Sequence, residues 1–155
     1  MTTAKHREPS FTITKQLPAP RENVWRAWTD HEAFAAWMAP YGVDPASVTL
    51  QPHFGGRYVY VMVNEQTGDQ FPTGGVYLEV QPLQRLVFTW GEPGAAVESS
   101  PTIIIELATG TDETTTDLTF CVRGFDGKPG DGFVYDGWDR ALANLEQYLR
   151  GTADR

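Results

Sequence analysis

The strongest constraint on the fold is an apolar stripe near the C-terminus of the chain. After a Gly-rich loop over residues 124–130, apolar side chains recur at spacings of four, three, four and four residues: Val134, Trp138, Ala141, Leu145 and Leu149. Because an α-helix has 3.6 residues per turn, these spacings put all five on one face of a helix over residues 131–150. Such a helix is about 30 Å long, so it requires an apolar surface of similar length to cover its stripe.

Strand patterns in the rest of the chain predict that surface. A first strand is predicted at residues 11–17, and six more at 47–51, 57–63, 71–81, 85–90, 102–109 and 114–122. In three of them apolar residues occupy every second position: Leu86, Phe88 and Trp90; Ile103, Ile105 and Leu107; Leu118, Phe120 and Val122. The positions between them are mostly polar, as in Thr89, Glu106, Asp117 and Thr119. This alternation predicts an antiparallel meander with one buried face.

Two short helices are predicted between the first two strands. The first covers residues 20–28, because Pro20 suits a first helical turn and Val24, Ala27 and Trp28 share one side. The sequence Thr29-Asp-His-Glu32 matches a capping box, with Thr29 as the N-cap of the second helix. That helix ends before Pro40 and presents three residues inward: Phe34, Trp37 and Met38.

These elements predict an α+β fold, in which two short helices and a long C-terminal helix pack on a curved antiparallel sheet of about seven strands. No repeat, low-complexity tract or Gly/Ser linker divides the 155 residues. We therefore expect a single domain over residues 10–150, with flexible ends at residues 1–9 and 151–155.

The charge balance limits the classes of partner. The chain has 12 basic and 20 acidic residues, and a net charge of -8 repels nucleic acid and anionic membranes. The single cysteine, Cys121, excludes a disulfide framework within the chain, which fits a reducing compartment. The N-terminus has no apolar stretch typical of a signal peptide, and no run of about 18 apolar residues occurs. We expect a cytoplasmic protein.

Six local patterns resemble the bacterial, single-domain branch of the activator of Hsp90 ATPase homologue family, which belongs to the START-related SRPBCC superfamily. They cover about residues 10–150 in the family's order: Val24–Asp30, Trp37–Pro40, Gly55–Met62, Gly75–Val80, Arg85–Trp90 and Gly137-Trp138. The resemblance implies the helix-grip fold. This chain differs from the family just before the Gly-Gly pair. It reads Gln51-Pro-His-Phe54 there, instead of the acidic residue and Arg that the family often carries.

No motif predicts a metal, a cofactor or a catalytic residue. His6, His31 and His53 are far apart, and Ala35 stands where a second zinc-binding His would follow His31. Cys121 has no basic neighbour nearer than Arg123 and is predicted on the outer strand face, as a structural or exposed thiol. Three carboxylates are also predicted on the solvent face, where paired acid/base chemistry is not expected: Glu79, Glu106 and Asp117.

What remains is an aromatic interior. If Arg57 faces solvent, alternation turns Tyr58, Tyr60 and Met62 inward. They would meet other rings between the sheet and the long helix, and the predicted ligand-binding residues are Trp37, Tyr58, Tyr60, Met62, Trp90, Phe120, Phe133 and Trp138. These side chains form either a packed core or a cavity of about 300 Å³ or more, with Tyr58 and Tyr60 as the groups that orient a ligand.

The opposite face of the same strand is apolar as well, with Val59, Val61 and Val63. Either the two faces are inverted or the valines form a contact surface, so the pattern leaves a homodimer open.

Three functions fit these observations. The resemblance implies relatives that bind hydrophobic ligands between the sheet and the long helix, including polyketide cyclases, co-chaperone domains and a self-sacrificing antibiotic-resistance protein. Our leading hypothesis is a domain that binds a hydrophobic or aromatic small molecule, as a sequestration or antibiotic-resistance factor. The alternatives are a co-chaperone-like protein-interaction module, although those relatives carry a further domain, and a cyclase-like enzyme that uses tyrosines and His53 for proton transfer.

Overall fold

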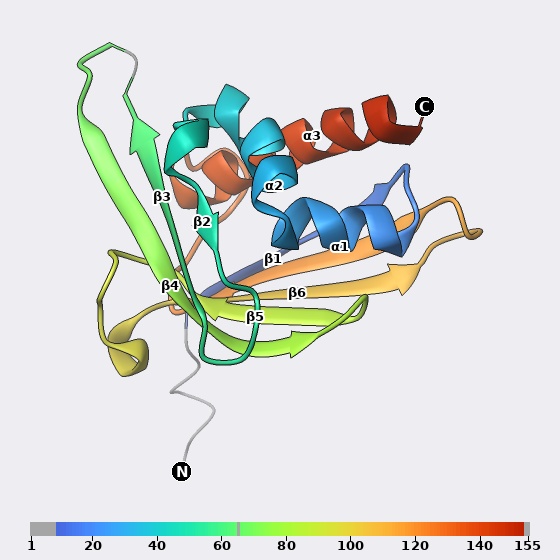
Figure 1. Ribbon diagram of the computed structural model, residues 1–155, viewed down its shortest axis with the longest axis horizontal. Coiled ribbons are helices and arrows are strands. Elements are labelled where there is room, and N and C mark those ends of the chain that lie inside the picture. Colours follow the sequence, from blue (N-terminus) through green and yellow to red (C-terminus); the bar gives the residue numbers. More distant parts are fainter. Residues whose placement is uncertain (1–8, 65, 154–155) are drawn as a thin grey trace.

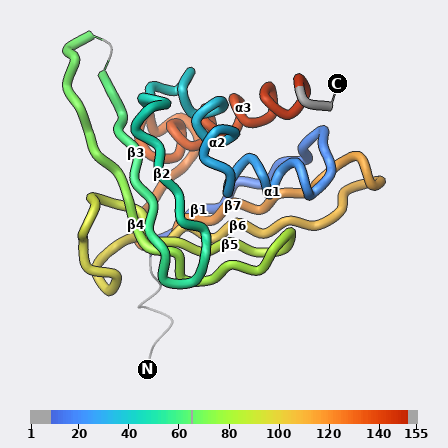
Figure 2. The backbone as a smooth tube through the Cα atoms, viewed as in Figure 1, coloured from blue at the N-terminus to red at the C-terminus, as the bar shows by residue number. Residues whose placement is uncertain are grey.

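The computed structural model describes residues 9–64 and 66–153. Seven antiparallel strands form one curved sheet in the order β1-β7-β6-β5-β4-β3-β2 (Figure 1). The strands are β1 (Ser10–Leu17), β2 (Thr49–Leu50), β3 (Arg57–Val63), β4 (Gln70–Gln81), β5 (Arg85–Thr89), β6 (Thr102–Thr109) and β7 (Thr116–Arg123). The predicted meander is confirmed. The N-terminal strand β1 adds to it as an edge strand by pairing with β7, which is the last strand in the sequence (Figure 2).

Three α-helices cover one face of the sheet (Figure 1). They are α1 (Arg21–Thr29), α2 (His31–Met38) and α3 (Val134–Ala153). In the described part of the chain, three short 3-10 turns occur in loops: η2 (Ala39–Tyr41), η3 (Pro45–Ser47) and η4 (Val97–Ser99). The predicted α+β helix-grip arrangement is confirmed. None of the helices in residues 9–64 and 66–153 has the length and apolarity needed to span a membrane.

The apolar stripe of α3 packs on the sheet as predicted. Trp138 is only 7% exposed, and Ala141, Leu145 and Leu149 are buried, together with Leu142. Val134 is half-buried at the start of the helix. The long helix therefore closes the core along most of its length.

The boundaries of α3 differ from the prediction. The helix begins at Val134 instead of residue 131, because the Asp131 carboxylate accepts hydrogen bonds from the backbone N–H groups of Phe133 and Tyr135 and fixes a turn ahead of it. It also continues to Ala153, past the predicted end at residue 150. The flexible segments predicted at residues 1–9 and 151–155 lie mostly outside the described residues.

Two local predictions were wrong. The N-cap of α2 is Asp30, whose side chain accepts a hydrogen bond from the backbone N–H of Ala33, whereas Thr29 ends α1 with its hydroxyl bonded to the Trp25 carbonyl. Thr and Asp both cap helices, so the one-residue shift follows from where α1 stops. The second strand is also shorter than predicted, because Pro45 begins η3.

The longest strand, β4, belongs to two hairpins. Its first part, from Gln70 to Val76, pairs with β3, and its second part, from Tyr77 onward, pairs with β5 with a register shift between Tyr77 and Glu79. A β-bulge of this kind bends a strand. The β3–β4 hairpin accordingly rises steeply from the other strands (Figure 1).

Near this bend the predicted alternation of β5 fails. Thr89, predicted to face solvent, is buried, and Trp90, predicted to be inside, is only half-buried beyond the end of the strand. The Thr89 hydroxyl accepts a hydrogen bond from the Val76 backbone N–H, where β4 has left its regular pairing with β5. The bend therefore replaces a strand-to-strand hydrogen bond with one from a side chain.

The faces of β3 are not inverted. Tyr58 and Tyr60 are buried toward the helices, and the valines of the other face are half-buried: Val59, Val61 and Val63. Residues 42–47 run beside this strand, since Val63 N–H donates to the Gly42 carbonyl and Val61 N–H donates to the Ser47 hydroxyl. The homodimer stays a prediction.

Candidate functional site

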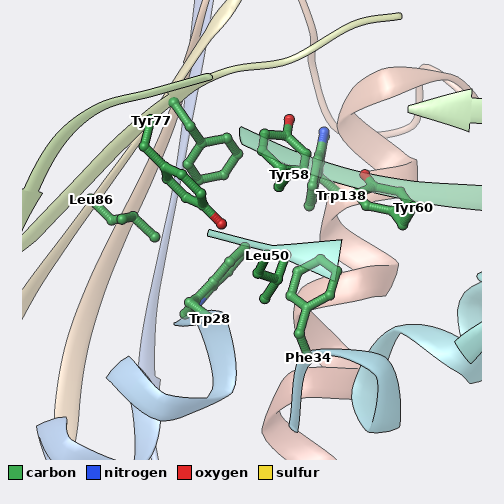
Figure 3. A pocket seen from close by; sticks show the side chains of 9 residues that line it. Trp28, Phe34, Leu50, Tyr58, Tyr60, Tyr77, Leu86 and Trp138 are labelled. Carbon is green, nitrogen blue, oxygen red and sulfur yellow. The ribbon is translucent and has the colours of Figure 1, made fainter. Parts of the chain in front are cut away.

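The aromatic interior contains two separate spaces. The first is an inner cavity of about 20 Å³, lined by Trp28, Phe34, Leu50, Tyr58, Tyr60, Tyr77, Leu86, Phe88 and Trp138 (Figure 3). The second is an open cleft of about 230 Å³, lined by Met38, Tyr41, Tyr60, Met62, Trp90, Phe133, Val134, Gly137 and Trp138. Tyr60 and Trp138 line both. The single cavity predicted from the sequence is therefore divided by these two side chains.

Most of the predicted ligand-binding residues line one of the two spaces. Those on the cleft are Tyr60, Met62, Trp90, Phe133 and Trp138, and Tyr58 lines the inner cavity. Trp37 and Phe120 line neither, which corrects the prediction. Both are fully enclosed by other rings: Trp37 packs edge-on against Trp28, and Phe120 lies 4.8 Å from Trp138 between ring centroids.

Phe133 lies at the edge of the cleft, and its predicted inward orientation is wrong. Its side chain is 67% exposed. Because α3 begins one residue later, Phe133 belongs to the preceding loop and lies on no buried helical face. It contacts Phe125, with 6.1 Å between the ring centroids.

The tyrosine hydroxyls differ in their partners. Tyr58 donates a hydrogen bond to the Thr89 carbonyl at 2.7 Å, so this hydroxyl is satisfied within the protein. Burial raises the pKa of Tyr60, and a hydrogen bond with the Trp90 side chain opposes that rise. The prediction that Tyr58 orients a ligand is therefore not supported by the geometry, because its hydroxyl points away from the inner cavity (Figure 3).

Tyr77 is a cavity residue that the sequence prediction missed. Its side chain is 2% exposed, and its hydroxyl points into the inner cavity (Figure 3). Burial raises its pKa. Tyr77 pairs with Phe88, which was predicted to face inward, and directly paired residues share a face of the sheet. Knowledge of the strand register would have identified it.

Gly137 makes room for another tyrosine that the sequence prediction missed. A Cβ atom at Gly137 would lie 2.4 Å from the Tyr41 hydroxyl, which is too close for any real contact. Tyr41 can therefore lie against α3 only because this position is a glycine. Burial raises the pKa of Tyr41, and the positive charge of Arg140 opposes the rise.

The lining is uncharged throughout. Of the described residues that line the cavity and the cleft, none is Asp, Glu, Lys, Arg or His. Transfer of an ion from water into such surroundings is very unfavourable unless a counter-charge is present. The two spaces therefore suit an uncharged, largely apolar guest.

The other chemical groups considered from the sequence lie elsewhere. Arg85 bridges Glu79 and Glu106 across neighbouring strands, with a distance of 2.6 Å from its Nη1 to Glu106 Oε2. Asp117 is exposed on β7, and Cys121 is half-buried on the face opposite Phe120. Within residues 9–64 and 66–153, no group of three or more His, Cys, Asp or Glu side chains could hold a metal ion.

Comparison with known proteins agrees with this architecture. The family described as Activator of Hsp90 ATPase homolog 1-like protein matches residues 18–150. The chain belongs to this family. No curated protein matches the chain.

Solved structures extend the agreement to the whole domain. The chain is similar to protein NE0264 from Nitrosomonas europaea, with 25% identity, a TM-score of 0.73 and coverage of 95% of this chain and 97% of that one. It is also similar to protein CV1439 from Chromobacterium violaceum, with 26% identity, a TM-score of 0.74 and coverage of 90% of this chain and 96% of that one. Protein SA2116 from Staphylococcus aureus, described as of unknown function, shares the fold at 15% identity, with a TM-score of 0.72 and coverage of 96% and 98%.

Proposed function

We propose that this family member binds an uncharged hydrophobic or aromatic small molecule in the cleft at the start of α3, and acts by sequestering that molecule. The observation that carries the proposal is the cleft itself, about 230 Å³ between the sheet and α3 and lined by aromatic and methionine side chains. Methionine side chains are apolar and adaptable, and aromatic side chains offer large apolar surfaces. Ligand pockets are lined mainly by side chains of these kinds.

The volume of the cleft limits the ligand. Drug-sized ligands typically occupy pockets of about 300–1,000 Å³. The cleft is somewhat smaller, and the inner cavity adds about 20 Å³. We therefore expect a ligand of two or three fused rings, or a larger one that displaces the exposed ring of Phe133.

A thermal-shift screen of aromatic polyketides, lipids and drug-like scaffolds tests the proposal. A ligand that binds only the native protein at 100 times its Kd stabilises it by about 2.7 kcal/mol, which raises the Tm of a domain of this size by about 5–10 °C. No shift with any member of a broad apolar library would contradict the proposal.

A matched pair of substitutions in α3 locates the site. Gly137→Ala adds a methyl group to the lining of the cleft, 2.4 Å from the present position of the Tyr41 hydroxyl, so Tyr41 must move. We expect this change to abolish or strongly weaken the thermal shift. Gly151→Ala is the control, because a Cβ there meets nothing within 4 Å and the change in helix propensity is the same. Equal ligand shifts in both variants would place the binding site outside the cleft.

A protein-interaction role, as the family's description suggests, is the second candidate, and exposed aromatic side chains favour it. Phe71 of β4 is 53% exposed and lines an open groove of about 660 Å³ with Phe125 and Trp90. Exposed apolar surface of this kind often binds another protein. Stimulation of the ATPase of an Hsp90 by the purified chain, lost in Phe71→Ser, would favour this role over ligand binding.

The cyclase-like alternative has less support. His53 is exposed in the loop before β3, and among the described residues the only titratable side chains that line the cleft are Tyr41 and Tyr60. Burial raises the pKa of both, which makes them weak acids at neutral pH.

A further inference from the structure

The inner cavity is lined by a tyrosine hydroxyl that has no hydrogen-bond partner among the described residues. Tyr77 is 2% exposed, and no side chain or backbone group among the described residues hydrogen-bonds to its hydroxyl. A buried polar group without a partner is strongly unfavourable, and such groups in native proteins are rare. The Tyr77 hydroxyl faces the cavity (Figure 3), so a water molecule or a ligand atom inside the cavity can be its partner.

Surrounding structure holds this hydroxyl in place. The backbone of Tyr77 is bonded on both sides to the loop before β3, since its N–H donates to the Gly56 carbonyl and its carbonyl accepts from the Gly55 N–H. The rings of Tyr58 and Phe88 pack against its ring, with centroids 5.7 Å and 6.0 Å away. Tyr77 is thus a pre-organised polar group in an apolar pocket, as expected of a residue that orients a ligand.

The size and position of the cavity suit one polar group of a larger molecule. Its volume of about 20 Å³ accommodates about one water molecule or one ligand oxygen atom. Tyr60 and Trp138 line both spaces and separate the inner cavity from the open cleft, so a ligand in the cleft reaches the cavity only where one of these two rings shifts. A ligand whose rings lie in the cleft can then extend one polar atom toward Tyr77.

The chemistry of the lining selects an uncharged acceptor. Tyr77 can donate a hydrogen bond to a group in this cavity, and no charged side chain among the described residues lines it. A carboxylate would have no counter-charge on this lining, whereas a carbonyl oxygen accepts hydrogen bonds without carrying a charge.

We propose that the Tyr77 hydroxyl determines ligand specificity, by donating a hydrogen bond to the carbonyl oxygen of a planar, uncharged aromatic ketone or quinone whose rings lie in the cleft. This inference rests on the proposed function and specifies the class of ligand.

Two probes of the same shape test it: 9-fluorenone, which has a carbonyl group, and fluorene, which has none. Dissociation constants are measured by equilibrium dialysis for the wild-type protein, Tyr77→Phe and Tyr148→Phe. We expect Tyr77→Phe to raise the Kd for 9-fluorenone by about three- to tenfold, as for the loss of one hydrogen bond. The Kd for fluorene should stay within about twofold of the wild-type value. Tyr148→Phe is the control, because Tyr148 is a half-buried residue of α3 that lines neither the cavity nor the cleft, and it should leave the ratio of the two constants unchanged.

The remaining outcomes separate the two proposals. If both probes bind and Tyr77→Phe changes their affinities equally or not at all, Tyr77 does not hydrogen-bond to the carbonyl group of the ligand. The proposed ligand-binding function is then kept, and the role of Tyr77 is rejected. If neither probe binds the wild-type protein up to its solubility limit, the ligand-binding proposal fails and the inference fails with it. Tighter binding of fluorene-9-carboxylate than of 9-fluorenone would overturn the preference for an uncharged ligand.

Discussion

The two ends of the aromatic interior differ in how well they are filled. At the closed end, the Trp28 ring packs against both Trp37 and Phe120, and the Trp37 indole N–H donates to the Ala27 carbonyl at 2.8 Å. At the open end, Tyr41, Met62, Trp90 and Phe133 line a cleft of about 230 Å³. Both ends are built from the same residue types.

The difference lies in what covers the rings. The closed end lies under α1, α2 and the part of α3 from Trp138 onward, whose buried residues fill the space above the sheet (Figure 1). At the open end the cover is the first turn of α3, where Gly137 has no side chain and Phe133 precedes the helix. An aromatic cluster thus becomes core or cleft according to the elements above it.

The largest expected effect compares one phenylalanine from each end. Phe120→Ala should lower the free energy of unfolding by about 3–5 kcal/mol, because the side chain is 0% exposed and its loss leaves a cavity. Phe133→Ala, the matched change at the open end, should alter it by about 0.5 kcal/mol or less. Urea unfolding followed by circular dichroism measures both.

Trp138→Ala tests where the boundary between the two ends lies. This ring is 7% exposed and contacts both Phe120 and Trp90, so we again expect a loss of about 3–5 kcal/mol. A loss below about 1 kcal/mol would show that the start of α3 is not firmly packed, and the contrast between the ends would disappear.

An intermediate effect compares two buried tyrosine hydroxyls. Tyr58→Phe removes the hydrogen bond to the Thr89 carbonyl and should cost about 1 kcal/mol of stability in the absence of ligand. Tyr77→Phe removes a hydroxyl that has no partner among the described residues and that a water molecule in the cavity can satisfy, so it should change stability by about 0.5 kcal/mol or less. Thermal unfolding of the two variants decides the order, and an equal loss in both would mean that the Tyr77 hydroxyl has a partner in the free protein.

The smallest expected effect concerns how α3 is attached over the closed end. Glu146 accepts hydrogen bonds from Arg150 and Lys15, and the Lys15 Nζ to Glu146 Oε1 distance of 3.2 Å links α3 to β1. The hydrogen bond from Arg150, followed by that from Lys15, lowers the pKa of Glu146 below its usual value of 4.5. Its stabilising contribution is therefore present above that value and is lost as the pH falls through the lowered pKa.

Glu146→Gln measures this contribution. We expect a loss of about 0.5 kcal/mol at pH 7, because the groups are partly exposed, and a difference from wild type that shrinks as the pH falls below 4.5 and through the lowered pKa of Glu146. Glu113→Gln, an exposed position in the turn between β6 and β7, is the control. A difference at pH 7 that persists unchanged to pH 3 would mean that the effect of Glu146→Gln is not electrostatic.

Periodicity in the sequence was sufficient to predict the elements and their order. The spacing of Trp138, Leu145 and Leu149 predicted the long helix, and alternation predicted the meander, because both periods are set by local backbone geometry. Tyr58 and Tyr60 were assigned to the correct face for the same reason. The errors at Thr29 and at residue 131 are small shifts, since several neighbouring residues can cap a helix.

Only the tertiary structure decided which rings enclose space. Trp37, Phe120 and Phe133 belonged to the predicted site on residue type, but the first two are core and the third lies at the edge of the cleft. Tyr77 and Gly137 were missed because their roles depend on a bend in β4 and on the position of Tyr41 against α3. Sequence periodicity determines which way a side chain points, whereas a void depends on long-range packing between elements that no local pattern records.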